Sequence, residues 1–383
     1  MRLIEAPQLN VTYADADDNI GHWVTGKVPV RAGGDGTVPA PGWTGECDWT
    51  GEIPFAEMPH MLNPEQGFIV SCNNRLMPDG YPHFLGNEWM NGWRARRITD
   101  VLLSKEKVSG EDCQNLHMDV ACLPARELLK RIETLAKDKG TDPDIRLALD
   151  LLRGWDCRLI PDSAAAALYE VIRHTLVRNL LEPGLGPDLA KRLMGRGFHP
   201  LLFKVSELQG KDTVALFRLL DRPDSWWVRQ AGGRDELVAR SVSQAIRWLR
   251  KELGPRTDRW EWGRIHRVTF AHPLGLRKPL DKVFNRGPLP MGGDTDTPCQ
   301  TAFVPSEPYD NTAWSPTFRQ IVEPGDWSKS LSVQPPGQSG NLASPHYDDL
   351  MVPWHEGRYH PMLWTRDQVE REKEAVLVLT AAG

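Results

Sequence analysis

Two adjacent asparagines are the residues of this sequence best placed to do chemistry. Asn73 and Asn74 directly follow an alternating run, Gly67 to Cys72, which predicts a β-strand. Asparagines at a strand end are typical of a turn, because their side chains hydrogen-bond the local backbone. The same position suits catalysis, since a side-chain amide can donate a hydrogen bond to a developing oxyanion. Composition and spacing leave both interpretations open.

Three other polar motifs imitate reactive sites. Residues 15–19 resemble the start of a calcium-binding loop, but isoleucine stands at its sixth position and glycine at its twelfth, where glycine and glutamate are required. The run His346-Tyr347-Asp348-Asp349, taken with His355 and His360, matches no known metal-ligand spacing. Residues 337–340 lack the final glycine of a nucleophile elbow. We interpret all three as turns and loops.

Composition excludes several classes of protein. The 383 residues, 40% hydrophobic and 25% charged, are enough chain for a globular fold of two or three domains. A net charge of −5 gives no electrostatic footprint for nucleic acid, and no apolar run approaches the length of a membrane span. The six cysteines form no C-x-x-C pair, so we expect mostly buried free thiols, with a single disulfide left open.

The elements that must position these residues fall into three regions. Residues 1–93 are rich in Gly, Pro and Trp and contain a hairpin signal, whereas residues 94–255 have helical periodicity. Residues 256–383 return to alternating runs, with strands predicted at 264–271, 300–304, 317–322 and 375–379 and a short helix at 365–373. This order predicts an α+β fold whose two β-rich ends share one sheet system.

An ordered set of motifs runs along almost the whole chain. The motifs include Asp48-Trp49-Thr50-Gly51-Glu52-Ile53-Pro54-Phe55, Asn63-Pro64-Glu65-Gln66-Gly67, Gly292-Gly293-Asp294, Pro335-Pro336-Gly337-Gln338-Ser339-Gly340-Asn341 and Ser344-Pro345-His346-Tyr347-Asp348-Asp349. This ordered set resembles the penicillin amidase (penicillin acylase) family of N-terminal-nucleophile hydrolases. The resemblance implies a partial αββα sandwich with residues 94–255 as a helical region. It covers the C-terminal part of the family's large (beta) subunit.

The resemblance also implies an activity. Family members hydrolyse linear N-acyl amides, such as β-lactam side chains, acyl-homoserine lactones or lipopeptides, through an acyl-enzyme. Their nucleophile is an N-terminal serine or cysteine whose own α-amine acts as the base. This sequence begins Met1-Arg2, so we expect the nucleophile, the small subunit and the N-terminal part of the large subunit to lie upstream, and this chain alone to be inactive. A periplasmic or secreted location is implied as well, although the sequence shows no signal peptide.

Three residues can be carried over from the family. Asn73 matches the asparagine that completes the oxyanion hole, and Arg97 matches an arginine that orients the asparagine region. Arg94 and Arg96 are expected on a solvated helix face or in salt bridges. Glu88 falls near the acidic ligand of a structural calcium that some members bind. No cofactor is implied for the chemistry itself.

A non-catalytic role is the alternative. Fifteen tryptophans could hold a carbohydrate or aromatic ligand in a cleft lined by Trp43, Trp49, Trp89 and Trp93, and an inactive relic of the enzyme is a further alternative. The expected partner in the main interpretation is a small N-acyl amide, with no nucleic acid and no membrane. Cys72 stands where some relatives carry tryptophan, so penicillin specificity is not transferred.

Overall fold

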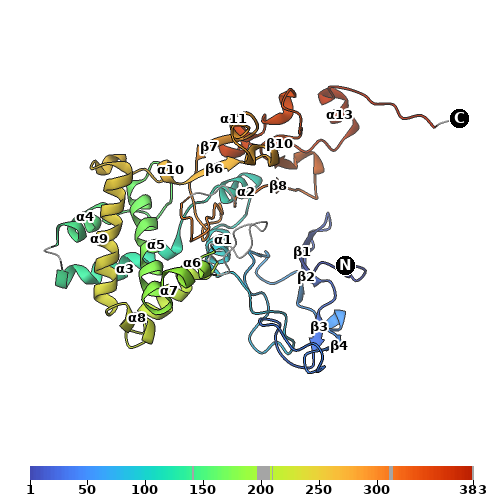
Figure 1. Ribbon diagram of the computed structural model, residues 1–383. Helices are drawn as coiled ribbons and strands as arrows, with labels where there is room; N and C mark the ends of the chain where they lie inside the picture. The colour runs from blue at the N-terminus through green and yellow to red at the C-terminus, as the bar shows by residue number, and fades with distance from the viewer. Residues whose placement is uncertain (140–141, 196–207, 209, 310–313, 382–383) are drawn as a thin grey trace.

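The computed structural model describes residues 1–139, 142–195, 208, 210–309 and 314–381. The long helices gather on one side of the molecule, the N-terminal strands lie apart from them, and the C-terminal segment runs across the top in the view of Figure 1. A short helix, α1 (Trp93–Leu103), lies between these parts. The start of α1 is therefore where the N-terminal strands and the helices meet.

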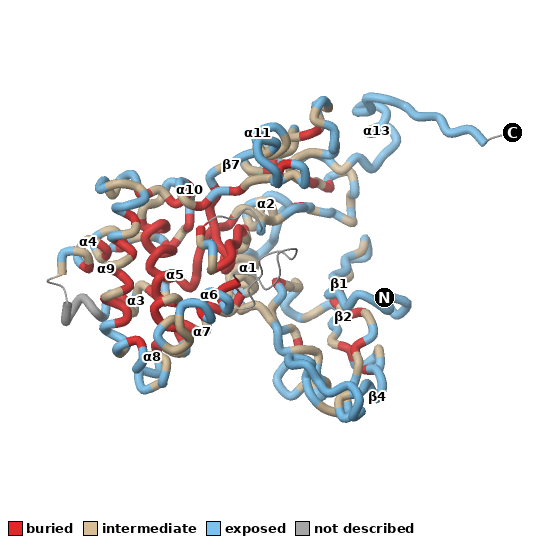
Figure 2. The backbone as a smooth tube through the Cα atoms, viewed as in Figure 1, coloured by how far each residue is buried: buried red, intermediate tan, exposed pale blue. Residues whose placement is uncertain are grey.

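The helical part is built around α5 (Ala164–Leu185), which is buried along most of its length (Figure 2). Ser163 caps its start by accepting from the backbone N–H of Ala166, and Gly186 ends it with a φ of 75°. Pro183 lies inside the last turn of α5 and does not end the helix. Helices α3 (Leu123–Lys139), α4 (Pro143–Leu152) and α9 (Arg234–Leu253) pack around α5 and enclose the largest core.

The remaining helices are short. They are α2 (Gly110–His117), α6 (Pro187–Leu193), α7 (Asp212–Leu220), α8 (Trp226–Gln230), α10 (Trp262–Ile265), α11 (Asp281–Phe284), α12 (Met351–His355) and α13 (Arg366–Glu372). Helix α13 confirms the predicted short helix, and Thr365 with Gln368 forms a capping box at its start. In the part of the chain that the structure describes, no helix is both long enough and apolar enough to cross a membrane.

The N-terminal strands form two small sheets. The predicted hairpin is confirmed as β1 (Leu9–Ala14) and β2 (Ile20–Thr25), which pair antiparallel, and β5 (His60–Leu62) joins the other edge of β2. β3 (Pro29–Arg31) pairs with β4 (Trp49–Glu52). At the hairpin, Asp15 Oδ1 accepts from the backbone N–H groups of Asp17 and Asn19, each at 2.9 Å, as expected of an acidic turn.

The C-terminal strands form two further sheets, and the prediction of one sheet system shared by both ends of the chain is wrong for the described residues. β6 (Arg267–Phe270) pairs with β7 (Arg286–Pro290), while β8 (Arg319–Ile321), β9 (Leu331–Val333) and β10 (His360–Pro361) form a three-stranded sheet. No strand from one end pairs with a strand from the other among these elements.

Three predicted strands are wrong as well. Residues 300–304 are buried on irregular backbone, and residues 375–379 are extended without a ladder partner. Gly67 to Cys72 form no strand, because Gly67 takes a φ of 75° and the N–H of Cys72 bonds the side-chain Oδ1 of Asn74 at 3.1 Å. Alternating apolar residues indicate that one side of a segment is buried. An irregular segment can be buried in the same way, so alternation alone does not prove a strand.

Candidate active site

Asn73 sits where two loop segments meet. Its backbone carbonyl accepts from the N–H of Met90 at 3.0 Å, and an isolated parallel bridge joins Asn74 to Met90. The φ of Asn73 is 60°, in the left-handed region, which asparagine tolerates better than most residues because its short polar side chain can bond locally. Asn73 is exposed, so its amide is accessible to a ligand.

Arg94, in the first turn of α1, holds the Asn73 side chain. Its Nη2 donates to Asn73 Oδ1 at 2.8 Å and to the carbonyl of Cys72 at 2.6 Å. A guanidinium can only donate, so it fixes the amide with the oxygen toward Arg94 and the nitrogen away from it. In the described part of the chain, no hydrogen bond occupies Asn73 Nδ2. Its N–H groups are thus a free and oriented donor pair.

Asn74 behaves differently from its neighbour. Its Oδ1 accepts from the N–H of Cys72 at 3.1 Å, and its Nδ2 donates to the carbonyl of Arg75 at 3.1 Å. Both ends of this amide are occupied by local backbone, which is the turn role that the sequence left open. The structure therefore separates the pair: Asn74 builds the turn, and Asn73 presents a donor.

The expectation that Arg94 lies on a solvated helix face is wrong. Arg94 is half-buried against Cys72 and Asn73. Burial lowers the pKa of the Arg94 guanidinium, and Coulombic interactions with Cys72 and Asp296 oppose that shift. No ion pair with Arg94 occurs within the described ranges. Arg96, by contrast, is exposed as expected.

Arg97 points to a different partner. Its Nε donates to Oδ2 of Asp119 at 2.7 Å, and the same carboxylate lies 3.7 Å from Arg158. These side chains line a cavity of about 370 Å³ between α1 and α2. Arg97 forms no hydrogen bond with Asn73 among the residues described, so its assignment as the arginine that orients the asparagine stays a prediction.

Glu88 lies in an ion pair with Lys211. One carboxylate already neutralised by an ammonium group is a poor calcium ligand, because calcium takes six to eight oxygens. Within the described residues, no three His, Cys, Asp or Glu side chains come together in a metal-binding group. The residues present around Glu88 thus do not form a calcium site by themselves, and we derive no chemistry from one.

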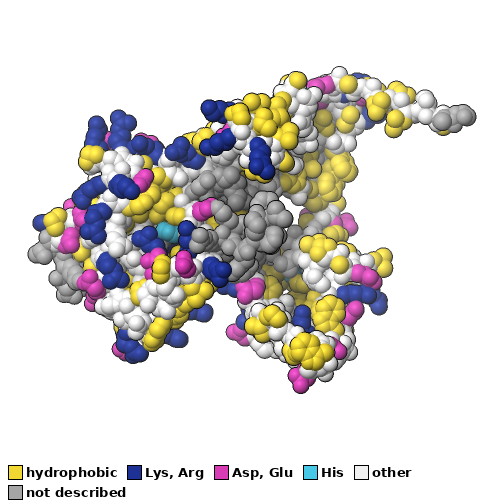
Figure 3. Space-filling view, in the orientation of Figure 1, with side chains coloured by type: hydrophobic (Ala, Val, Ile, Leu, Met, Phe, Trp, Pro, Cys, Tyr) yellow, Lys and Arg dark blue, Asp and Glu magenta, His cyan; other side chains and the backbone are white. Residues whose placement is uncertain are grey.

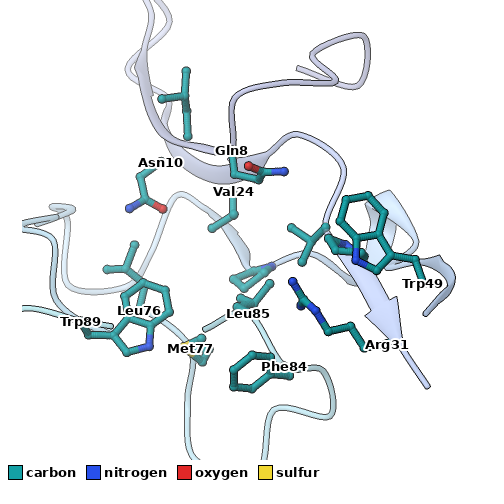
Figure 4. Close-up of a pocket in the computed structure, with 14 residues that line it drawn as sticks. Gln8, Asn10, Val24, Arg31, Trp49, Leu76, Met77, Phe84, Leu85 and Trp89 are labelled. Atoms are coloured by element: carbon teal, nitrogen blue, oxygen red, sulfur yellow. The ribbon is translucent and has the colours of Figure 1, made fainter. Parts of the chain in front are cut away.

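An apolar cavity of about 460 Å³ opens beside this region (Figure 4). Leu76, Met77 and Trp89 form one wall, and they come from the two segments that meet at Asn73 and Met90. The other walls come from the N-terminal strands and the loop before α1: Gln8, Leu9, Asn10, Val24, Val28, Pro29, Arg31, Trp49, Pro59, Phe84 and Leu85. The arrangement can accept an apolar group of moderate size, with Arg31 at its rim.

The four tryptophans proposed for a ligand-binding cleft do not meet in one cleft. Trp49 and Trp89 line the apolar cavity, but Trp43 is 89% exposed and is not among the residues that line it. Trp93 instead packs edge-on against Phe217 of α7 at a centroid distance of 6.4 Å. The aromatic enrichment therefore divides between a cavity wall, the helical core and the surface.

Comparisons with known proteins place the chain in a family. The penicillin amidase family model matches residues 1–371. The chain is 32% identical over 364 residues to penicillin acylase 2 proenzyme of Pseudomonas sp. (strain SE83), covering 95% of this chain and 45% of that protein. It is 29% identical over 379 residues to acyl-homoserine lactone acylase QuiP of Pseudomonas syringae pv. syringae (strain B728a), covering 94% of this chain and 44% of that protein.

The fold is similar to that of a solved acylase. A thermostable penicillin G acylase from Alcaligenes faecalis superposes with a TM-score of 0.63 at 20% identity, over 99% of this chain and 68% of that one. The fold comparison and the family match point to the same class of protein. This chain belongs to the penicillin amidase family, and it spans less than half the length of the two curated relatives named above.

Proposed function

We propose that this chain supplies the oxyanion-stabilising part of an enzyme that hydrolyses linear N-acyl amides through an acyl-enzyme. The observation that carries the proposal is the free Nδ2 of Asn73, oriented by the Arg94 guanidinium. The attacking group comes from a part of the acylase outside these 383 residues. The completed enzyme adopts the αββα sandwich of the N-terminal-nucleophile hydrolases.

The chemistry assigned to this chain is electrostatic. When the nucleophile attacks the substrate carbonyl, negative charge develops on its oxygen, and Asn73 Nδ2 donates a hydrogen bond to that oxygen. Arg94 keeps the amide from rotating and adds positive charge behind it. One donor of this kind typically contributes about 10²–10³ in turnover, or roughly 3 kcal/mol. The intermediate then collapses, the amine leaves, and water releases the acyl group.

The substrate class follows from the cavity and the relatives. An apolar cavity of about 460 Å³ suits an apolar acyl group, and its wall shares the segments that carry Asn73. The relatives are named for penicillin and for acyl-homoserine lactones. We infer that the substrate is an N-acyl amide with an apolar acyl group, such as a β-lactam side chain, an acyl-homoserine lactone or a lipopeptide.

Assembly with an upstream acylase segment is part of the proposal. Apolar side chains gather on the surface of the N-terminal strands in the view of Figure 3, and Leu9, Tyr13 and Leu62 of these strands are exposed. Large exposed apolar groups of this kind are typical of a covered interface. We propose that the upstream segment covers this face and that the assembled enzyme is periplasmic or secreted.

The test uses two preparations. In one, residues 1–383 are assayed alone; in the other, called here the assembled acylase, they are co-produced with the acylase segment that precedes the matched region in the relatives. Phenylacetyl and fatty-acyl anilides serve as chromogenic substrates. We expect turnover only in the assembled acylase. Turnover by residues 1–383 alone would contradict the external nucleophile, and ligand binding without turnover in both would favour the binding module.

A further inference from the structure

A buried carboxylate, that of Asp296, is connected by a hydrogen bond to the segment just before α1. Asp296 is 1% exposed, and its two oxygens have separate partners. Oδ1 accepts from Asn91 Nδ2 at 2.6 Å, and Oδ2 accepts from Thr213 Oγ1 at 3.0 Å. A buried carboxylate with both oxygens bonded is held in one place, because losing either bond would leave a desolvated charge unpaired.

Asn91 connects Asp296 to the candidate site. Its Oδ1 accepts from the N–H of Trp93, the first residue of α1, at 3.1 Å, while its own N–H donates to Gly210 at 2.7 Å. Gly92, the N-cap residue, offers no side chain for capping, so Asn91 serves the exposed end of the helix instead. The next residue back, Met90, donates to the carbonyl of Asn73.

Asp296 and Arg94 also interact electrostatically. Arg94 is half-buried, and among the described residues its hydrogen bonds reach only neutral acceptors: Asn73 Oδ1, the Cys72 carbonyl and the Met90 sulfur. A Coulombic interaction with Asp296 opposes the lowering of the Arg94 pKa by burial. A partly desolvated cation bonded to neutral acceptors gains from a fixed negative charge nearby.

We propose that Asp296 is a positioning residue for the oxyanion donor. Through Asn91 it fixes the start of α1, from which Arg94 holds Asn73, and the bridge between Met90 and Asn74. The catalytic meaning of this role rests on the proposed function. The physical linkage from Asp296 to Asn73 does not depend on it.

Three further acidic residues, Glu170, Asp212 and Asp294, are also buried and form a cluster with Asp296. Their hydrogen bonds differ from those of Asp296. Asp212 bonds Arg173 at 2.6 Å and Glu170 bonds Arg173 at 2.8 Å, so these carboxylates are committed to α5. Asp294 accepts from the backbone N–H of Asp296 at 2.8 Å. Asp212→Asn is therefore a matched control, since it also neutralises a buried acid of the cluster but touches neither Asn91 nor Arg94.

The experiment observes the Asn73 side-chain amide directly. Residues 1–383 are labelled with ¹⁵N-asparagine, and the Asn73 Nδ2 resonance is assigned with the N73D variant. We expect Asp296→Asn to shift and broaden this resonance, and Asp212→Asn to leave it within its linewidth. Equal displacement by both variants, or none by Asp296→Asn, would overturn the proposal, because the cluster would then act only as general core.

Two further variants keep the test decisive. Asn91→Ser removes the contact while leaving the Asp296 charge, and it replaces Asp296→Asn if that variant does not fold. The exchange of the pair, N91D with D296N, rebuilds the hydrogen bond with the carboxylate at position 91, and we expect it to restore the Asn73 resonance. A resonance that stays displaced in the exchanged pair would contradict the linkage.

A kinetic arm measures the consequence. In the assembled acylase we expect Asp296→Asn to lower kcat about tenfold or more with KM changed less than twofold, since small misplacement of a catalytic group costs mainly turnover. A change confined to KM would contradict the positioning role. An unmodified assembled acylase without turnover would count against the proposed function and leave the resonance measurement valid.

Discussion

Arg94 and Asn73 form a directed pair: Nη2 of Arg94 donates to Oδ1 of Asn73 across 2.8 Å, and the same nitrogen holds the Cys72 carbonyl at 2.6 Å. Because the arginine has no acceptor, the pair can form in only one orientation of the amide. The free Nδ2 is a consequence of that chemistry. The proposed role of Asn73 as the oxyanion donor depends on this orientation.

The backbone at Asn73 gives a prediction about stability. Its φ of 60° suits asparagine and glycine but strains other residues. We expect Asn73→Ala to lower the free energy of unfolding of residues 1–383 by about 1–2 kcal/mol, and Asn73→Gly to lower it less, although both remove the donor. Urea unfolding of the two variants measures this. Equal losses would show that the side-chain bond to Arg94, rather than the backbone, dominates.

Substitution of Arg94 and substitution of Arg97, both near the start of α1, should have different effects on kcat. Arg94→Lys keeps a positive charge but cannot hold both Asn73 and Cys72 in the same way, so we expect kcat of the assembled acylase to fall about tenfold or more. Arg97→Lys alters the ion pair with Asp119, and we expect less than a threefold change in kcat. The reverse order of effects would return the orienting role to Arg97.

Occupation of the apolar cavity is tested with a pair of tryptophans. Trp49 lines the cavity and is 71% exposed, so its removal should not disturb the core, while Trp43 is 89% exposed and stands outside it. We expect Trp49→Ala to raise KM for a fatty-acyl anilide roughly fivefold, from about 1 kcal/mol of lost apolar contact, and Trp43→Ala to leave it unchanged. Equal effects would place the acyl group elsewhere.

The buried acids predict a pH dependence. Burial raises the pKa of Asp212 to about 6 from an ordinary 3.8, so the folded state binds the proton more tightly than the unfolded chain between these values. Stability from this group is therefore present at low pH and is lost as the pH rises through about 6.

Asp212→Asn removes that titration. We expect the variant to gain stability relative to the wild type as the pH rises from 4 to 7, by an order of about 1–3 kcal/mol. Urea unfolding at each pH gives the difference, and the exposed Asp258→Asn, whose carboxyl has a pKa lowered by Arg256, serves as the control. A difference between wild type and Asp212→Asn that does not change with pH would contradict the raised pKa.

Local sequence patterns predicted the helical region and the first hairpin. They could not predict contacts between segments that are distant in the sequence. Apolar periodicity and capping residues located the main helices, and the acidic turn located the first hairpin, because each signal lies within a few residues. The alternating run before Asn73 misled, since its last N–H is taken by the Asn74 side chain.

The candidate site, too, could be predicted from the sequence only in part. Asn73 could be singled out by its position and by resemblance, but Arg94 could not be chosen over Arg97 until the helix was placed. The bond from Asn91 to Asp296 joins residues 205 positions apart, and no local pattern in the sequence indicates it. Hydrogen bonds of this kind depend on how whole elements pack.

The central claim is that Asn73 Nδ2 stabilises the developing oxyanion, and the most direct measurement compares Asn73→Asp with Asn74→Asp in the assembled acylase. Each exchanges an amide nitrogen for oxygen with little change in shape, but only the first removes the free donor. We expect kcat/KM for a phenylacetyl anilide to fall about 10²–10³-fold in Asn73→Asp and by less than threefold in Asn74→Asp. An Asn73→Asp enzyme with kcat/KM within threefold of the wild type would contradict the claim.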